Sequence, residues 1–227
     1  LGVSVGQAAI FELKDGDRVA FLGDAFIERM QVHNHLELRL TTAWPDRNII
    51  FRNLGWSGDT PRGVSRAGLS LQQAGREPAD EGWKQLQKQI ELVKPTVVFL
   101  GYGMSSSFEN QAEQFGKDIR VLKAAILKAA GGPVRFVVLS PLRHEHLGGE
   151  LPDPSAHNLQ LAAYTKELKS LSDSDGDFFI SLFEAEALLN AKSSLTENGI
   201  HPSGHGYARV AKEICRQLGV PEHPKLN

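Results

Sequence analysis

Short apolar segments alternate along the chain with longer segments of helical period, and this alternation restricts the possible folds more than any other feature. The apolar segments are RVAFLG (18–23), NIIFRN (48–53), TVVFLG (96–101), VRFVVLS (134–140) and DFFISL (177–182). Nearly continuous apolar strands are typical of a parallel sheet that is covered on both faces. We therefore predict an α/β fold, a three-layer α/β/α sandwich around a mainly parallel sheet of about five strands.

Helical periodicity predicts helices in the connecting segments at 25–43, 82–93, 108–130, 155–172 and 203–218. In the last of these, apolar residues recur at spacings of three and four: Tyr207, Val210, Ala211, Ile214, Cys215 and Leu218. We therefore expect Cys215 to lie in the core rather than to act as a reactive thiol. Because the alternation continues throughout, we predict a single domain over 1–227, with its core at about 17–219.

Composition excludes several classes of function. The chain has 227 residues with 25 Lys and Arg against 27 Asp and Glu, so its formal charge of −2 provides no basic surface for nucleic acid. No apolar segment approaches the roughly 20 residues of a membrane span. No signal peptide is visible, although an exported protein whose signal segment has been removed would look the same. The single cysteine excludes an intrachain disulfide, and the compartment stays open.

Polar and small residues follow the predicted strands, where parallel sheets bind their ligands. Gly23-Asp24-Ala25 follows the first strand, LGWSGDT (54–60) the second and GYGMSSSFEN (101–110) the third. A further segment, LTENGIHPSGHGY (195–207), precedes the last predicted helix. We therefore expect these four segments to form the functional site.

Four stretches within these segments resemble, in the right order, the sequence blocks of the SGNH hydrolase superfamily, the GDSL-type lipases and esterases. They are FLGDA, WSGDT, LGYGMSSS and NGIHPSGHGY, and the similarity covers essentially the whole chain. The resemblance implies a flavodoxin-like sandwich and hydrolysis of ester bonds. In this family a serine attacks the carbonyl, a histidine takes its proton and an aspartate orients the imidazole.

Carried over by position, the resemblance places His201 as the base and Gly58 in the oxyanion hole. Three other positions depart from the pattern. Ala25 stands at the nucleophile position and has no hydroxyl, and Asn198 stands at the position of the aspartate. The oxyanion asparagine falls on Gly103 or Ser105, depending on the alignment, and of these only Ser105 could donate a hydrogen bond from its side chain.

Further residues are predicted to line the cleft. The resemblance implies that Asp24 is structural and orients the loop backbone. Trp56 and Tyr102 could stack on a sugar or an acyl group, or could be buried under a loop. Ser57 and Ser105 are weaker candidates for a relocated nucleophile, because loop serines usually bind only the backbone.

The histidines do not form a pattern typical of a metal site. His144 and His146 follow the fourth strand, on the same rim as His201, and His205 lies close by. No carboxylate or cysteine stands at the spacing of zinc ligands, so we expect a solvated or ligand-facing loop with no metal and no cofactor.

The three departures together favour natural divergence over a single engineered replacement of serine by alanine. The sequence therefore predicts a degenerate hydrolase-like protein, non-catalytic or weakly active, that binds a small ester or carbohydrate-type ligand. The alternative is an active esterase or acylhydrolase on small or carbohydrate acyl esters. In that case Ala25 replaces an original serine by design, or the nucleophile lies elsewhere.

Overall fold

A computed structural model describes residues 11–67, 75 and 80–222. Within these residues one parallel sheet has the strand order β2-β1-β3-β4-β5. Its strands are β1 (Arg18–Gly23), β2 (Ile50–Asn53), β3 (Val97–Gly101), β4 (Arg135–Leu139) and β5 (Phe178–Ile180). The predicted parallel sheet is confirmed, although all strands after the first are shorter than expected. The ends of the predicted domain, 1–10 and 223–227, lie outside the described residues.

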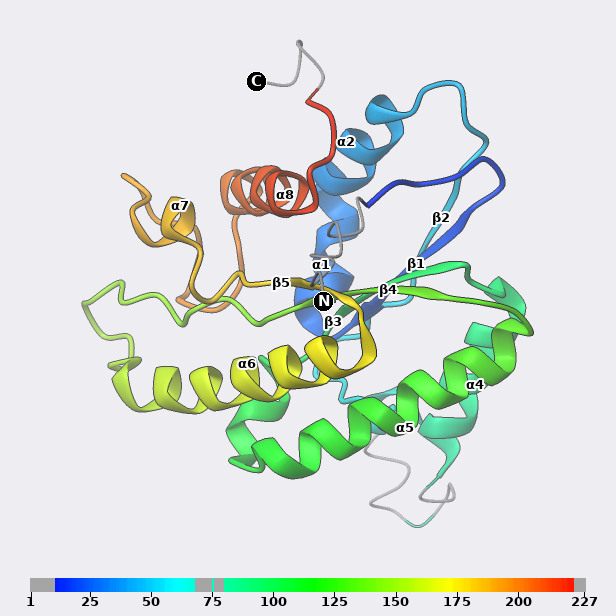
Figure 1. Ribbon diagram of the computed structural model, residues 1–227. Coiled ribbons are helices and arrows are strands. Elements are labelled where there is room, and N and C mark those ends of the chain that lie inside the picture. Colours follow the sequence, from blue (N-terminus) through cyan, green and yellow to red (C-terminus); the bar gives the residue numbers. More distant parts are fainter. Residues whose placement is uncertain (1–10, 68–74, 76–79, 223–227) are drawn as a thin grey trace, which may run out of the picture.

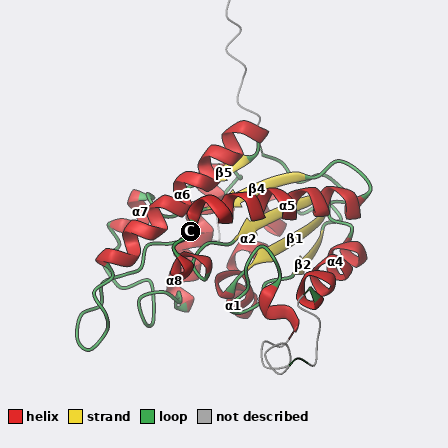
Figure 2. Ribbon diagram, turned by 90° about the horizontal axis from the view of Figure 1, so that it is seen from below, coloured by secondary structure: helices red, strands yellow, loops and turns green. Residues whose placement is uncertain are grey.

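Helices cover both faces of the sheet (Figures 1 and 2). On one face lie α1 (Ala25–His33), α2 (His35–Ala43) and α8 (Gly204–Leu218). On the other lie α4 (Glu81–Val93), α5 (Ala112–Ala130) and α6 (Ser155–Asp175). A short helix, α7 (Glu186–Leu189), precedes α8 beside β5. The three-layer α/β/α sandwich is therefore confirmed.

The two faces of the sheet have separate hydrophobic cores, because successive strand residues point to opposite sides. In β1, Val19 and Phe21 pack in the core that contains Ile214 of α8. Ala20 and Leu22 pack in the other core, with the helices α4, α5 and α6. Burial on both sides is the reason that the strands are nearly continuous in apolar residues. Cys215 is buried in the α8 core, as expected.

Two predicted helices are interrupted by asparagines in the left-handed conformation, which asparagine tolerates better than most residues. Asn34 (φ 51°) ends α1 and separates it from α2, so the helix predicted over 25–43 is two helices. Asn110 (φ 54°) ends a 3₁₀ turn at Ser106–Glu109, so α5 begins at Ala112 rather than at 108. The helix α7 was not predicted from the sequence.

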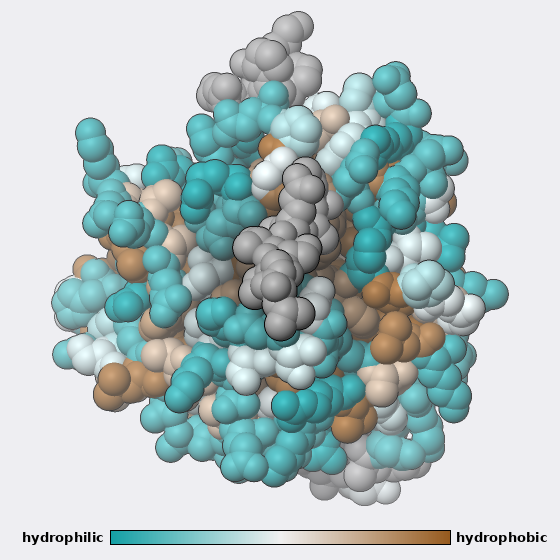
Figure 3. Space-filling model, in the orientation of Figure 1, coloured by the Kyte–Doolittle hydropathy of each residue, from teal (hydrophilic) through white to brown (hydrophobic). Residues whose placement is uncertain are grey.

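On the face shown in Figure 3, hydrophobic side chains lie in small separate groups among hydrophilic ones. None of the helices in the described part of the chain is both long enough and apolar enough to cross a membrane. Among the same residues, histidine, cysteine and carboxylate side chains do not form a group of three that could hold a metal ion.

Candidate functional site

The predicted site segments lie at the carboxyl edge of the sheet, because all strands run parallel and end there. The chain passes from β1 into α1 through Gly23, where a Cβ atom would lie 2.3 Å from the Gly101 carbonyl oxygen and 2.4 Å from Ile27 Cγ1. Only glycine allows this close approach. The tight packing places Ala25 at the first position of α1, beside the end of β3.

Asp24 joins the first and third segments. Its buried carboxylate accepts a hydrogen bond from the Phe26 backbone N–H at 3.1 Å, which caps α1, and one from the Ser105 backbone N–H at 3.1 Å. Burial raises the pKa of Asp24 to about 6, against the lowering effect of these two N–H groups. The Asp24 carboxylate thus links the start of α1 to the third segment, and the side chain is 1% exposed.

The second segment is attached to β1 and α1. The Trp56 backbone N–H donates to the Gly23 carbonyl at 3.1 Å, and the Ser57 hydroxyl donates to the Glu28 carboxylate. Gly58 follows with φ +69°, a conformation that other residues rarely adopt. The Trp56 side chain is 43% exposed, so it is available to stack on a ligand.

Beneath this segment lies a buried ion pair. Arg66 Nε contacts an Asp59 carboxylate oxygen at 2.7 Å, and the Tyr102 hydroxyl donates to the same oxygen at 3.2 Å. Arg66 also donates to the Leu54 carbonyl and to Gln89 of α4. Tyr102 is only 2% exposed, so burial under a loop, the second of its two predicted alternatives, is correct. Its ring cannot stack on a ligand.

The segment before α8 and the first turn of α8 both contact α1. Arg29 pairs with Glu197 at 3.8 Å, and the Tyr207 hydroxyl donates to the Phe26 carbonyl at 2.8 Å. A small cavity of about 10 Å³ touches three of the site segments: Asp24 of the first, Met104 of the third and Ile200 of the last are among its lining residues. The first, third and last segments thus meet beside the start of α1.

Asn198 and His201 are hydrogen-bonded to each other in two ways. Asn198 Oδ1 accepts from the backbone N–H groups of His201, at 3.0 Å, and of Ile200, at 3.3 Å. Asn198 Nδ2 lies 3.0 Å from His201 Nδ1. The two backbone donors fix the orientation of the amide, because the reverse orientation would place its NH₂ group against them.

This contact determines which nitrogen of His201 carries the proton. The NH₂ group of Asn198 can only donate, so Nδ1 of His201 must accept, and the proton of the neutral ring lies on Nε2. Burial lowers the pKa of His201, and the positive charge of Arg29 lowers it further, while Glu197 opposes both. His201 is therefore a neutral hydrogen-bond donor at Nε2.

Glu145, which no sequence motif singled out, positions the segment before α8. Its carboxylate accepts from the backbone N–H groups of Leu195, at 3.0 Å, and Thr196, at 2.8 Å. His144, beside it, is only half-buried and contacts the ring of His157 at 3.0 Å between the Nδ1 atoms. His157 in turn bonds the hydroxyl of Ser107 at 2.7 Å. No sequence signal connects these residues, which lie 13 to 51 positions apart.

Comparison with solved structures identifies the fold. An acetylxylan esterase from Geobacillus stearothermophilus matches with a TM-score of 0.69 and 16% identity, over 93% of this chain and 98% of the esterase. A protein described as a GDSL-like lipase from Parabacteroides merdae matches with a TM-score of 0.70 and 16% identity, over 94% and 100% of the two chains. The chain has the fold of the GDSL-type (SGNH) hydrolases.

A third structure with the SGNH fold is a member of the lipolytic G-D-S-L family from Veillonella parvula, with a TM-score of 0.59 and 12% identity over 87% of this chain and 96% of the other. The structures of the Geobacillus esterase include two catalytic mutants, in which alanine replaces a serine or an aspartate. No protein-family model and no curated protein matches the sequence. The similarity to the SGNH hydrolases is thus one of fold, at low sequence identity.

Proposed function

We propose that the cleft around Ala25 and His201 binds a small ester or an acylated carbohydrate and does not hydrolyse it by a serine mechanism. The observation that carries the proposal is the hydrogen bond from Asn198 to His201 Nδ1. A general base must present an unprotonated nitrogen to the nucleophile, with the other nitrogen donating to its orienting partner. His201 has the opposite arrangement.

The other groups of the cleft support binding. Ala25 provides no hydroxyl that could attack a carbonyl, so hydrolysis lacks both a nucleophile and a base. The remaining groups are two hydrogen-bond donors, His201 Nε2–H and the Gly58 backbone N–H, and the indole of Trp56, which is 43% exposed. Donors of this kind suit the carbonyl oxygen of an ester, and an indole ring suits the face of a sugar.

The first test is hydrolysis of p-nitrophenyl acetate by the native chain, Ala25→Ser, Asn198→Asp and the double variant. We expect the native chain and both single variants to stay near the buffer rate. In a Ser-His-Asp triad, a histidine held in the wrong tautomer lowers kcat about 10⁴-fold. The hydrolysis rate of the double variant should therefore exceed that of Ala25→Ser by about 10² or more. Adding His201→Ala to the double variant should remove the gain.

Two results would contradict the proposal. Hydrolysis by the native chain above the buffer rate would show a working enzyme. A large gain in hydrolysis rate from Ala25→Ser alone would show that His201 already acts as a base.

Binding is tested separately by NMR titration with acetylated xylan oligosaccharides, the substrate class in the name of the Geobacillus esterase. Amide shifts at Ala25 and His201 that also occur with the deacetylated oligosaccharides would argue against recognition of the ester.

The alternative, an esterase with a relocated nucleophile, has one observation in its favour. The Ser57 hydroxyl donates to the Glu28 carboxylate, which could serve as a weak base. A fluorophosphonate probe distinguishes the two functions, because it labels activated serines. Labelling that disappears in Ser57→Ala would support the esterase, whereas an unlabelled native chain would support the binding protein.

A further inference from the structure

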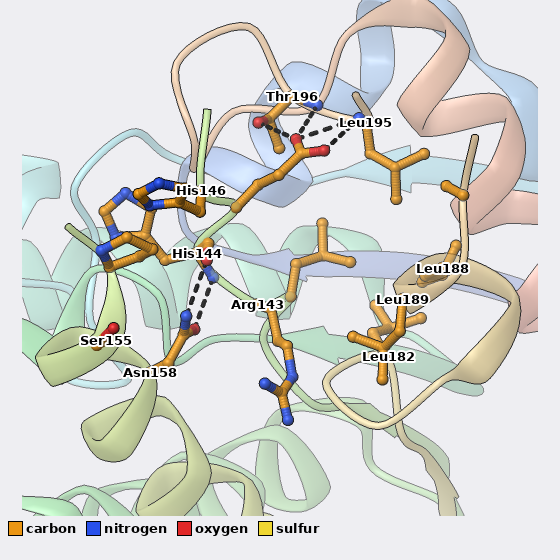
Figure 4. Close-up of a pocket in the computed structure, with 14 residues that line it drawn as sticks. Arg143, His144, His146, Ser155, Asn158, Leu182, Leu188, Leu189, Leu195 and Thr196 are labelled. Carbon is orange, nitrogen blue, oxygen red and sulfur yellow. Dashed lines mark hydrogen bonds between the residues drawn. The ribbon is translucent and has the colours of Figure 1, made fainter. Parts of the chain in front are cut away.

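A second pocket lies at the same edge of the sheet, beside β5, and contains none of the residues assigned to the cleft. It has a volume of about 360 Å³, within the roughly 300–1,000 Å³ typical of small-molecule sites. Its walls are the segment after β4, the start of α6, the segment around α7 and the residues Leu195 and Thr196 (Figure 4). Ala25, Gly58, Asn198 and His201 are not among its lining residues.

Hydrogen bonds hold two walls of this pocket in place. Asn158 of α6 bonds both the backbone N–H and the carbonyl of His144, each at 2.9 Å. Glu145 bonds the backbone N–H groups of Leu195 and Thr196 from the other side. The pocket is therefore preformed, and a ligand would not have to order these segments.

The inner surface is apolar. Leu142, Leu182 and Leu188 line it and are themselves 7%, 1% and 6% exposed, while Leu189, at the rim, is 46% exposed. An aliphatic chain fits such a surface better than a polar ligand, because polar groups there would lose their hydrogen bonds to water. The lining therefore favours an alkyl group.

A fixed positive charge stands at the same pocket. Arg143 Nε donates to the Phe183 carbonyl at 3.2 Å, and the guanidinium lies 4.5 Å from the centre of the Phe183 ring, so the side chain is held. No carboxylate in the described part of the chain forms an ion pair with Arg143. Its outer nitrogens can therefore bind an anion, and a planar carboxylate matches their geometry.

Glu145, the acidic residue among those that line the pocket, does not compete with a ligand for the Arg143 guanidinium. The Glu145 carboxylate is directed to Leu195 and Thr196, and their dashed hydrogen bonds lie in Figure 4 at the opposite end of the view from the Arg143 guanidinium. We infer that the pocket binds a medium-chain aliphatic carboxylate, with its carboxylate on Arg143 and its alkyl chain against the leucines. This site goes beyond the proposed function, since it uses no residue of the cleft.

The inference is tested by isothermal titration of the native chain with hexanoate, octanoate, octanol and octylamine. We expect saturable binding of octanoate, tightening about fourfold for each added methylene between hexanoate and octanoate. Octanol should bind about tenfold more weakly than octanoate, and octylamine should bind no better than octanol. Equal binding of octanoate and octanol, or no saturable binding of octanoate, would overturn the inference.

Variants locate the site. Arg143→Gln should weaken octanoate binding about tenfold and leave octanol unchanged, whereas Arg120→Gln, an exposed arginine on α5, should change neither. Leu189→Gln, at the exposed rim, should weaken both ligands. Octanoate shifts in NMR spectra should map to the amides of Leu188 and Leu195. Shifts that map instead to Gly58 and His201 would place the ligand in the cleft and overturn the inference.

Discussion

Asn198 has the size of an aspartate but the opposite hydrogen-bonding capacity where it meets His201. An aspartate would accept a hydrogen bond from Nδ1–H and leave Nε2 unprotonated, whereas the amide donates a hydrogen bond to Nδ1 and leaves the proton of the ring on Nε2. The sequence identified the missing charge at this position. It could not reveal the reversed tautomer, because that depends on the two backbone N–H groups that orient the amide.

The ionisation of Asp24 should affect the stability of the fold. Its pKa rises from 3.8 to about 6 on folding because the carboxyl group is buried. A raised folded pKa means that the native state binds the proton more tightly than the unfolded state. Protonation of Asp24 therefore contributes to the free energy of unfolding fully below about pH 3.8, and this stabilisation is lost as the pH rises through 6.

The matched variant is Asp24→Asn, which cannot titrate. Its NH₂ group would face the Ser105 N–H, so we expect it to be less stable at every pH. The stability advantage of the native chain over the variant should shrink by up to about 3 kcal/mol between pH 4 and pH 7. Urea unfolding at several pH values measures this difference, and an advantage that is constant or grows with pH would contradict the account.

At the scale of elements, the attachment of the second segment to α1 depends on a glycine. A Cβ atom at Gly55 would lie 2.2 Å from the backbone nitrogen of Glu28, so Gly55→Ala must displace the segment that carries Trp56 and Gly58. We expect a loss of about 2 kcal/mol or more in the free energy of unfolding. Gly132→Ala is the control, because nothing lies within 4 Å of its added Cβ. Equal unfolding free energies for the two variants would refute the proposed close packing.

The buried pair of Asp59 and Arg66 fixes the same segment from beneath, with side chains only 0% and 1% exposed. Arg66→Met would leave the Asp59 carboxylate buried without its partner, and we expect a cost of about 3–5 kcal/mol. The double variant Asp59→Asn/Arg66→Met should recover part of that loss in denaturant unfolding. A double variant as unstable as the sum of both single variants would show that the two residues do not act as a pair.

Element boundaries show where sequence patterns fail. Apolar runs located the five strands in the described part of the chain, because burial on both faces leaves a continuous signal. The breaks at Asn34 and Asn110 were missed, since an asparagine inside a helical pattern enters the left-handed conformation only where the surrounding packing requires it. The short helix α7 spans only Glu186–Leu189, too few residues for a helical period to appear.

For the whole molecule, the order of the sequence blocks predicted the SGNH fold, and the solved structures confirm it at 16% identity or below for the structures compared above. Long-range contacts could not be predicted. The attachment of Glu145 to Leu195 and Thr196 spans about 50 residues, and the pocket with Arg143 depends on it. Such pairs arise from the spatial order of strands, which brings β4 and the segment before α8 together.

His201 should hold its proton on Nε2, and NMR of the imidazole nitrogens detects that proton directly. The chain has eight histidines, so a His201→Gln variant assigns the signal in a sample with ¹⁵N-labelled histidine. At pH 8 we predict a protonated Nε2 in the native chain and a protonated Nδ1 in Asn198→Asp. A native chain whose Nδ1 already carries the proton would contradict the account and restore His201 as a competent base.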